Sequence, residues 1–113
     1  MAALEARGFE KPQILMFRGI HQKAKDWEDE GFEVKANIGG WDRPSLIEGI
    51  MPDLRGKRGD DIRIGCVAFE NEIENSKESW KKLIAYAERN KNVSLRFYTI
   101  GNNGVCSLWK ILT

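Results

Sequence analysis

The sequence has little cysteine and histidine, no long apolar run and almost no net charge. Two cysteines, Cys66 and Cys106, form no disulfide framework, so a reduced cytoplasmic setting is expected. No apolar stretch approaches the ~20 residues that span a bilayer, and the amino end lacks the apolar core of a signal peptide. We therefore expect no membrane partner. A formal net charge of +1 gives no global attraction to nucleic acid, so such binding needs a local patch.

The apolar content is sufficient for one hydrophobic core. Hydrophobic residues make up 42% of the 113 residues and include four Trp and five Phe. A chain of this length predicts one domain, because domains cluster near ~100–150 residues. Residues 1–12, which end at Pro12, are expected to form an N-terminal arm or a short helix, and residues 13–113 the domain.

Two stretches have the spacing of amphipathic helices. In residues 14–30, apolar side chains that include Trp27 recur at positions i, i+4 and i+7, which places them on one helix face. A second helix is predicted over residues 76–89, begun by a capping box between Asn75 and Glu78. We expect the tryptophan of each helix to be buried.

Five further stretches are typical of strands, because they alternate or carry apolar runs between turn residues. The second and third form a hairpin around a glycine-containing turn, and the third has apolar residues on both faces. A strand of that kind is expected at the centre of the sheet. The strands are residues 32–38, 53–56, 62–70, 93–100 and 105–112, with a turn at 101–104 before the last.

This order of elements, with Pro52 and Asp53 opening the hairpin, resembles the PD-(D/E)xK superfamily of restriction-endonuclease-like nucleases over residues 21–100. The resemblance implies an α/β fold with an αβββαβ core, in which helices flank a mixed central sheet, and here an extra C-terminal strand. In that family a divalent ion lies between an Asp on the second strand and an acidic-x-Lys triplet on the third. Asp53 matches the first half of the pattern.

The second half departs from the pattern, because Cys66 and Ala68 stand where a carboxylate and a lysine are expected. A thiol does not replace a carboxylate for Mg²⁺, which takes hard oxygen ligands, and alanine supplies no ammonium to steady developing phosphate charge. The resemblance therefore implies weak Mg²⁺ or Mn²⁺ binding at most. For catalysis to survive, Asp53 and a displaced Glu70 would hold the metal and Lys35 would assist the attacking water.

A basic cluster lies in and beside the hairpin turn, and an aromatic residue lies in the glycine-rich loop before it. Cations there would contact phosphates, which position a protein on a nucleic acid without reading sequence. The aromatic residue would stack on a base or on a partner, or fill the core. These predicted nucleic-acid-binding residues are Arg55, Lys57, Arg58, Arg63 and Trp41.

Three functions fit these observations. The leading hypothesis is a DNA- or RNA-binding domain of nuclease-like fold with weakened or lost metal-dependent cleavage. The second is an active Mg²⁺- or Mn²⁺-dependent endonuclease whose acidic ligands have migrated. The third is a protein-interaction domain or homodimerisation domain without nucleic acid, which the near-zero charge and the apolar final strand favour.

Overall fold

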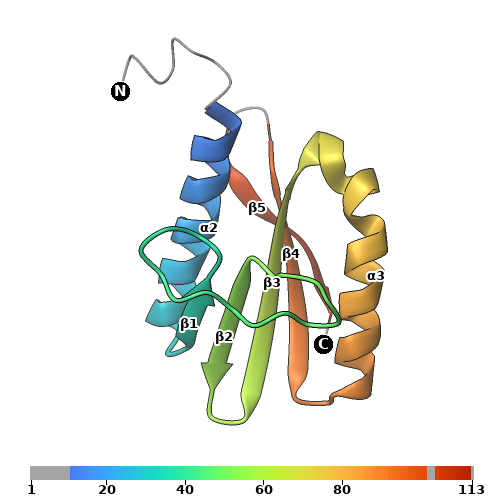
Figure 1. Ribbon diagram of the computed structural model, residues 1–113. Coiled ribbons are helices and arrows are strands. Elements are labelled where there is room, and N and C mark those ends of the chain that lie inside the picture. The colour runs from blue at the N-terminus through green and yellow to red at the C-terminus, as the bar shows by residue number, and fades with distance from the viewer. Residues whose placement is uncertain (1–10, 102–103, 113) are drawn as a thin grey trace.

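The computed structural model describes residues 11–101 and 104–112, so most of the predicted arm and part of the 101–104 turn lie outside the described residues. Two helices flank one sheet (Figure 1). Neither of these described helices combines the length and the hydropathy of a membrane span. In chain order the elements are α2 (Lys11–Asp29), β1 (Glu33–Ala36), β2 (Leu54–Arg58), β3 (Asp61–Phe69), the 3-10 helix η1 (Glu70–Glu72), α3 (Ile73–Arg89), β4 (Val93–Ile100) and β5 (Cys106–Leu112).

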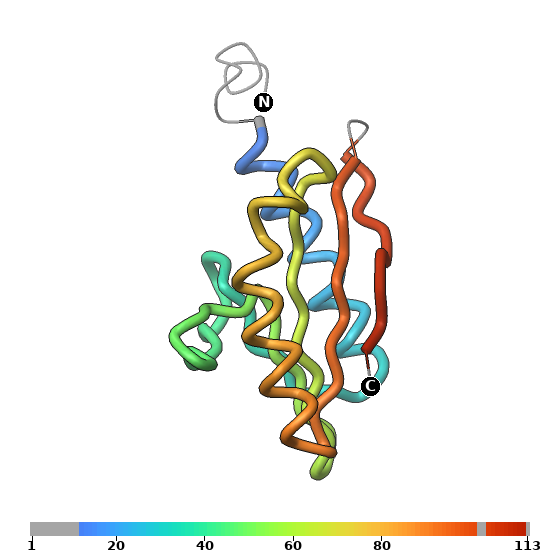
Figure 2. Tube along the Cα trace, turned by 90° about the vertical axis from the view of Figure 1, so that its right-hand side faces the viewer, coloured from blue at the N-terminus to red at the C-terminus, as the bar shows by residue number. Residues whose placement is uncertain are grey.

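The five strands form a mixed sheet whose spatial order follows the chain. β1, β2 and β3 pair in antiparallel fashion, β3 and β4 run parallel with α3 as the crossover, and β5 returns antiparallel to β4. Helix α2 packs on one face of the sheet and α3 on the other (Figure 2). The predicted α/β class with a mixed, helix-flanked sheet is therefore confirmed, with β3 in the central place predicted for it.

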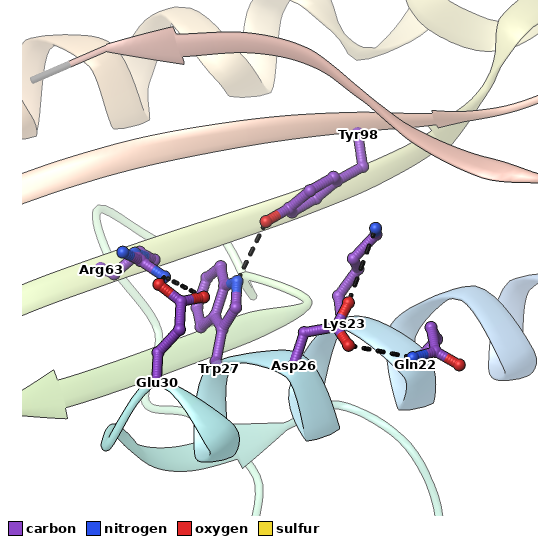
Figure 3. A network of polar contacts seen from close by, with 7 residues as sticks. All are labelled: Gln22, Lys23, Asp26, Trp27, Glu30, Arg63 and Tyr98. Atoms are coloured by element: carbon purple, nitrogen blue, oxygen red, sulfur yellow. Dashed lines mark hydrogen bonds and ion pairs between the residues drawn. The ribbon is translucent and has the colours of Figure 1, made fainter.

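On the α2 face, the indole of Trp27 lies in a slot between two glycines. An added Cβ would lie 2.8 Å from the indole Cη2 at Gly65 and 3.0 Å from its Cε3 at Gly56. The indole N–H donates to the hydroxyl of Tyr98 at 3.0 Å (Figure 3). The helix can approach β2 and β3 this closely only because neither strand has a side chain at these two positions.

A buried cation covers the same indole. Arg63 on β3 is 7% exposed, and its Nη1 donates to both carboxylate oxygens of Glu30 at 3.2 Å (Figure 3). Its guanidinium lies 4.2 Å from the ring centroid of Phe32 and 5.1 Å from that of Trp27. Because Glu30 directly follows α2, this pair joins the end of the helix to the centre of the sheet.

The α3 face has its own core, in which Trp80 packs on Phe97 with ring centroids 4.5 Å apart. Leu83 is fully buried beside them. The tryptophan of each helix is buried, as the sequence predicts. This second core packs the crossover helix α3 against β3 and β4.

The capping box predicted between Asn75 and Glu78 is wrong. α3 begins at Ile73, and Glu72 before it makes no side-chain cap. The 3-10 turn η1 leads directly from β3 into α3. Turns of this kind often continue into an α-helix, so the helix has begun before the chain reaches the residues that were expected to cap it.

We predict that Gly65→Ala lowers the free energy of unfolding by about 1–3 kcal/mol, the usual effect of overpacking a core. The added methyl would meet Trp27 and also lie 3.1 Å from Leu54 Cβ, and both neighbours are buried. Urea denaturation measures the change. Gly39→Ala is the matched control, because nothing lies within 4 Å of a Cβ added there. Equal stability of the two variants would contradict the slot.

Candidate functional site

Asp53 lies immediately before β2, where backbone bonds hold it between the loop after β1 and the middle of β3. Its N–H donates to the carbonyl of Gly65 at 3.1 Å, and its carbonyl accepts the N–H of Asn37 at 2.9 Å. Its carboxylate Oδ2 accepts the backbone N–H of Val67 at 2.8 Å. The side chain is therefore anchored to β3, between the two positions that depart from the family triplet.

The surroundings of Asp53 disfavour its negative charge. Burial raises the pKa of this carboxyl from 3.8 to about 6, although the Val67 N–H partly offsets the effect. Burial also raises the pKa of the Cys66 thiol, and the nearby Asp53 charge raises it further. Cys66 therefore stays a neutral thiol at physiological pH and supplies no thiolate ligand.

Cys66 and Ala68, the positions that the resemblance assigns to the triplet, face the closed α3 core. Cys66 is 4% exposed and Ala68 is 5% exposed, and both belong to the cluster of Trp80 and Leu83. Small apolar groups suit these positions, since a charge in such surroundings is costly unless it is paired. Cys66 and Ala68, where the resemblance would imply a carboxylate and a lysine, are thus part of the packed interior.

The structure does not gather the predicted metal and catalytic residues. Glu70 begins η1 and is exposed, four residues beyond Cys66 and thus roughly 13 Å along a strand. Lys35 lies on β1 opposite Arg55 rather than beside Asp53. Among the described residues, no group of three or more His, Cys, Asp or Glu side chains is placed to hold a metal ion.

The predicted basic cluster divides into two pairs on opposite faces of the sheet. Arg63 is bound to Glu30, and Arg58 donates to the Glu30 carbonyl at 2.8 Å. Arg55 and Lys57 alternate with the glycine that packs under α2, so they lie on the α3 side of β2. Neither of their side chains forms a hydrogen bond or ion pair with a described residue. The cations left available are therefore Arg55 and Lys57.

Trp41, the aromatic residue predicted to stack on a base or fill the core, packs against the α2-face core. Its ring meets His21 edge-on, with centroids 6.0 Å apart. His21 is exposed and also stacks on Phe17 at 5.9 Å. These contacts favour the core-filling role.

Two of the pockets among the described residues lie beside the hairpin, and sequence reasoning missed both. One, of about 440 Å³, opens beside Asp53 between the first turns of α2 and the end of β3. The other, of about 410 Å³, has Lys35 and Arg55 in its wall. The two cations are 20 positions apart in the chain, so only the strand register could have revealed the second pocket.

No family model matches the chain, and no curated protein sequence matches it. A fold of this kind can carry unrelated functions. The function must therefore be inferred from the chemistry of the site.

We predict that Asp53→Asn stabilises the protein at neutral pH and not in acid. The folded-state pKa of about 6 lies above the ordinary 3.8, so the folded state binds the proton more tightly. The stability that this proton supplies is present below about pH 4 and lost as the pH rises through about 6. The pH-dependent part of the difference between variant and wild type should reach about 2–3 kcal/mol by pH 7. Urea unfolding across this range measures it, and a difference independent of pH would contradict the assignment.

Proposed function

We propose that the chain is a nucleic-acid-binding domain of restriction-endonuclease-like fold that has lost metal-dependent cleavage. One observation carries the proposal: the Asp53 carboxylate accepts the N–H of Val67, the middle residue of the triplet position, at 2.8 Å. In the resembled family these two places are the two halves of the metal site. The order of a helix, three antiparallel strands, a second helix and a parallel strand also supports it.

The loss of cleavage is proposed from the donor set. Mg²⁺ and Mn²⁺ need several hard oxygen ligands, and this place offers one carboxylate, a neutral thiol and a methyl group. The residues present therefore do not fit such an ion, and no catalytic step is derived through it. Asp53 nevertheless remains half-buried with a pKa that burial raises, and carboxyl groups with raised pKa values are found at many functional sites.

The nucleic-acid surface is proposed to be a strip of three cations on β1 and β2. Arg55 and Lys57 lie on the α3 side of β2, and Lys35 lies directly opposite Arg55 on β1. Helix α3 packs over β3 and β4, farther along the sheet (Figure 1). Glu33 lies opposite Lys57 without forming an ion pair. In the chain the β2 part of the strip begins two residues after Asp53, and the pocket beside Asp53 opens toward α2, on the other face of the sheet.

We predict that Arg55→Gln combined with Lys57→Gln weakens binding to duplex DNA regardless of sequence. Each phosphate that is no longer neutralised should reduce the slope of log affinity against log salt by about 0.9, so the double variant should reduce it by about 1.8. Fluorescence anisotropy over a salt series measures the slope. The duplex should carry hydroxyl groups at all of its ends, so that no terminal phosphate contributes.

Arg58→Gln is the matched control on the same hairpin. It removes one positive charge, as each substitution of the double variant does, but Arg58 is committed to the Glu30 carbonyl and to the Phe32 ring, so the slope should stay unchanged. The proposal fails if the wild type shows no salt-dependent affinity for duplex, branched or single-stranded DNA or RNA. Cleavage of any of these by the wild type with Mn²⁺ would refute the loss of activity.

Strand β5 favours a second function, homodimerisation. It is the last strand of the sheet, with its outer edge unpaired by any described strand. Leu108 and Trp109 are each 48% exposed, and Ile111 is 44% exposed. Natural proteins usually protect such an edge, because it is a template for another chain.

A bulge in β5 interrupts the alternation of its side chains. Tyr98 of β4 pairs with Leu108, and the preceding Phe97 pairs with Lys110. Trp109 between them has no partner on β4. Trp109 and Lys110 therefore share one face of the sheet. This is the usual geometry of a bulge, in which two residues of one strand oppose a single residue of its neighbour.

The side-chain directions follow from these pairs. Leu108 and Ile111 lie on the α2 side. Trp109 lies on the α3 side, where its ring centroid is 5.6 Å from that of Trp80. Lys110 lies on that side too, because its partner belongs to the α3 core.

We propose that a second copy of the chain pairs with β5 in antiparallel fashion about a two-fold axis between Trp109 and Lys110. Opposite residues of such a pair share a face. In this register Leu108 opposes Ile111 of the second copy, and Trp109 opposes Lys110, an aliphatic pair and a cation–π pair. If the register between the two copies were shifted by one or two positions in either direction, at least one residue on the α2 side of one copy would oppose a residue on the α3 side of the other. The strand is therefore self-complementary in this register.

We predict that the wild type sediments as a dimer at micromolar concentration and that Leu108→Glu is a monomer, because its charge would lie against Ile111 of the second copy. Leu46→Glu is the matched control, since Leu46 is 61% exposed but lies in the loop before β2. In a Cys106→Ser background, Leu108→Cys with Ile111→Cys should form a covalent dimer on oxidation, whereas each single variant should not. A monomeric wild type, or cross-linking of the single variants, would overturn the register.

A further inference from the structure

The pocket with Lys35 and Arg55 in its wall lies between the sheet, α3 and the loop before β2. It measures about 410 Å³, which is within the range of ~300–1,000 Å³ typical of small-molecule sites. Tyr86 and Asn90 line it from the end of α3, and Ser45 from the loop. The loop crosses the sheet toward that end of α3 (Figure 1).

The two cations of this pocket face each other without a counter-ion. Lys35 and Arg55 are direct partners in the β1–β2 register, and both are half-buried. Neither side chain forms a hydrogen bond or ion pair with a described residue, and none of the described residues that line the pocket is acidic. Like charges directly opposite each other on neighbouring strands lower stability. An anion bound between Lys35 and Arg55 would therefore relieve their repulsion, and no described residue supplies one.

The roof of the pocket is preformed. Ile47 and Ile50 exchange two backbone hydrogen bonds of 2.8 Å, and the two residues between them, Glu48 and Gly49, have φ values of 51° and 77°. This is the pattern of a tight two-residue turn with both central residues in the left-handed region. The Glu48 carboxylate pairs with Arg89 of α3, which ties the turn to the helix. A pocket held open in this way loses little conformational entropy on binding.

We infer that this pocket binds a small phosphate monoester that carries a flat ring, such as a nucleoside monophosphate. A phosphate monoester carries a charge of about −1.5 to −2 at pH 7, which matches the two cations. The guanidinium of Arg55 can donate two parallel hydrogen bonds to phosphate oxygens, and Lys35 acts as a point charge. Tyr86 supplies an aromatic wall for the ring, and Ile64 an apolar surface beneath it.

Calorimetric titration of the wild type with adenosine monophosphate, inorganic phosphate and adenosine tests the inference. Adenosine monophosphate should bind at one site, inorganic phosphate more weakly, and adenosine without saturation. Lys35→Gln and Arg55→Gln should each weaken adenosine monophosphate at least ~10-fold, because each removes a charge-assisted hydrogen bond. Tyr86→Ala should weaken adenosine monophosphate and leave inorganic phosphate unchanged.

Arg18→Gln is the charge-matched control, since Arg18 is exposed on α2, and it should bind as the wild type does. Without ligand, Lys35→Gln should also raise the melting temperature, because the repulsion with Arg55 is relieved. A single strand with a 5′-phosphate that binds better than its 5′-hydroxyl form identifies a strand end as a source of the phosphate. Binding of the free nucleotide alone identifies a mononucleotide. The inference is overturned if adenosine monophosphate does not saturate the wild type, or if both cation variants bind it unchanged.

Discussion

The packing of Trp27 against two glycines sets the distance between α2 and the sheet, and the rest of the α2 face depends on it. The hydrogen bond to Tyr98 fixes the rotation of the indole, and the guanidinium of Arg63 packs over the indole ring. Through Glu30 the same arginine fixes the end of the helix. The slot is built from β2 and β3, which also hold Asp53. The helix and the candidate site are therefore positioned by one piece of packing.

Local sequence patterns predict the elements and the centre of the sheet well, because periodicity reports which side of an element is buried. The apolar residues on both faces of β3 predict its central place for this reason. The capping box fails because its signal is local, whereas the start of α3 depends on how the chain leaves β3. The pair of Glu30 with Arg63 joins residues 33 positions apart, and no local pattern marks it.

The candidate site, too, could be predicted from the sequence only in part. The Pro52–Asp53 dipeptide and the residues Cys66 and Ala68 are visible in the sequence, and it follows from ligand chemistry that a thiol and a methyl group do not hold hard cations. The sequence does not show that these two positions face the α3 core. Nor does it show that Arg58 and Arg63 are committed to Glu30 while Arg55 remains available. The availability of a cation depends on partners brought by other elements.

The two edges of the sheet differ in how strongly they resist the addition of a further strand. The β1 edge has four residues, two of them the charged Glu33 and Lys35, whereas β5 has seven residues with Lys110 as its one charge. Short and charged edges resist the addition of strands. If two copies pair only through their β5 edges about a two-fold axis, both β5 edges are occupied and no β5 edge remains for a third copy. The bulge at Trp109 and the brevity of β1 thus favour a closed pair over a fibre that lengthens without limit.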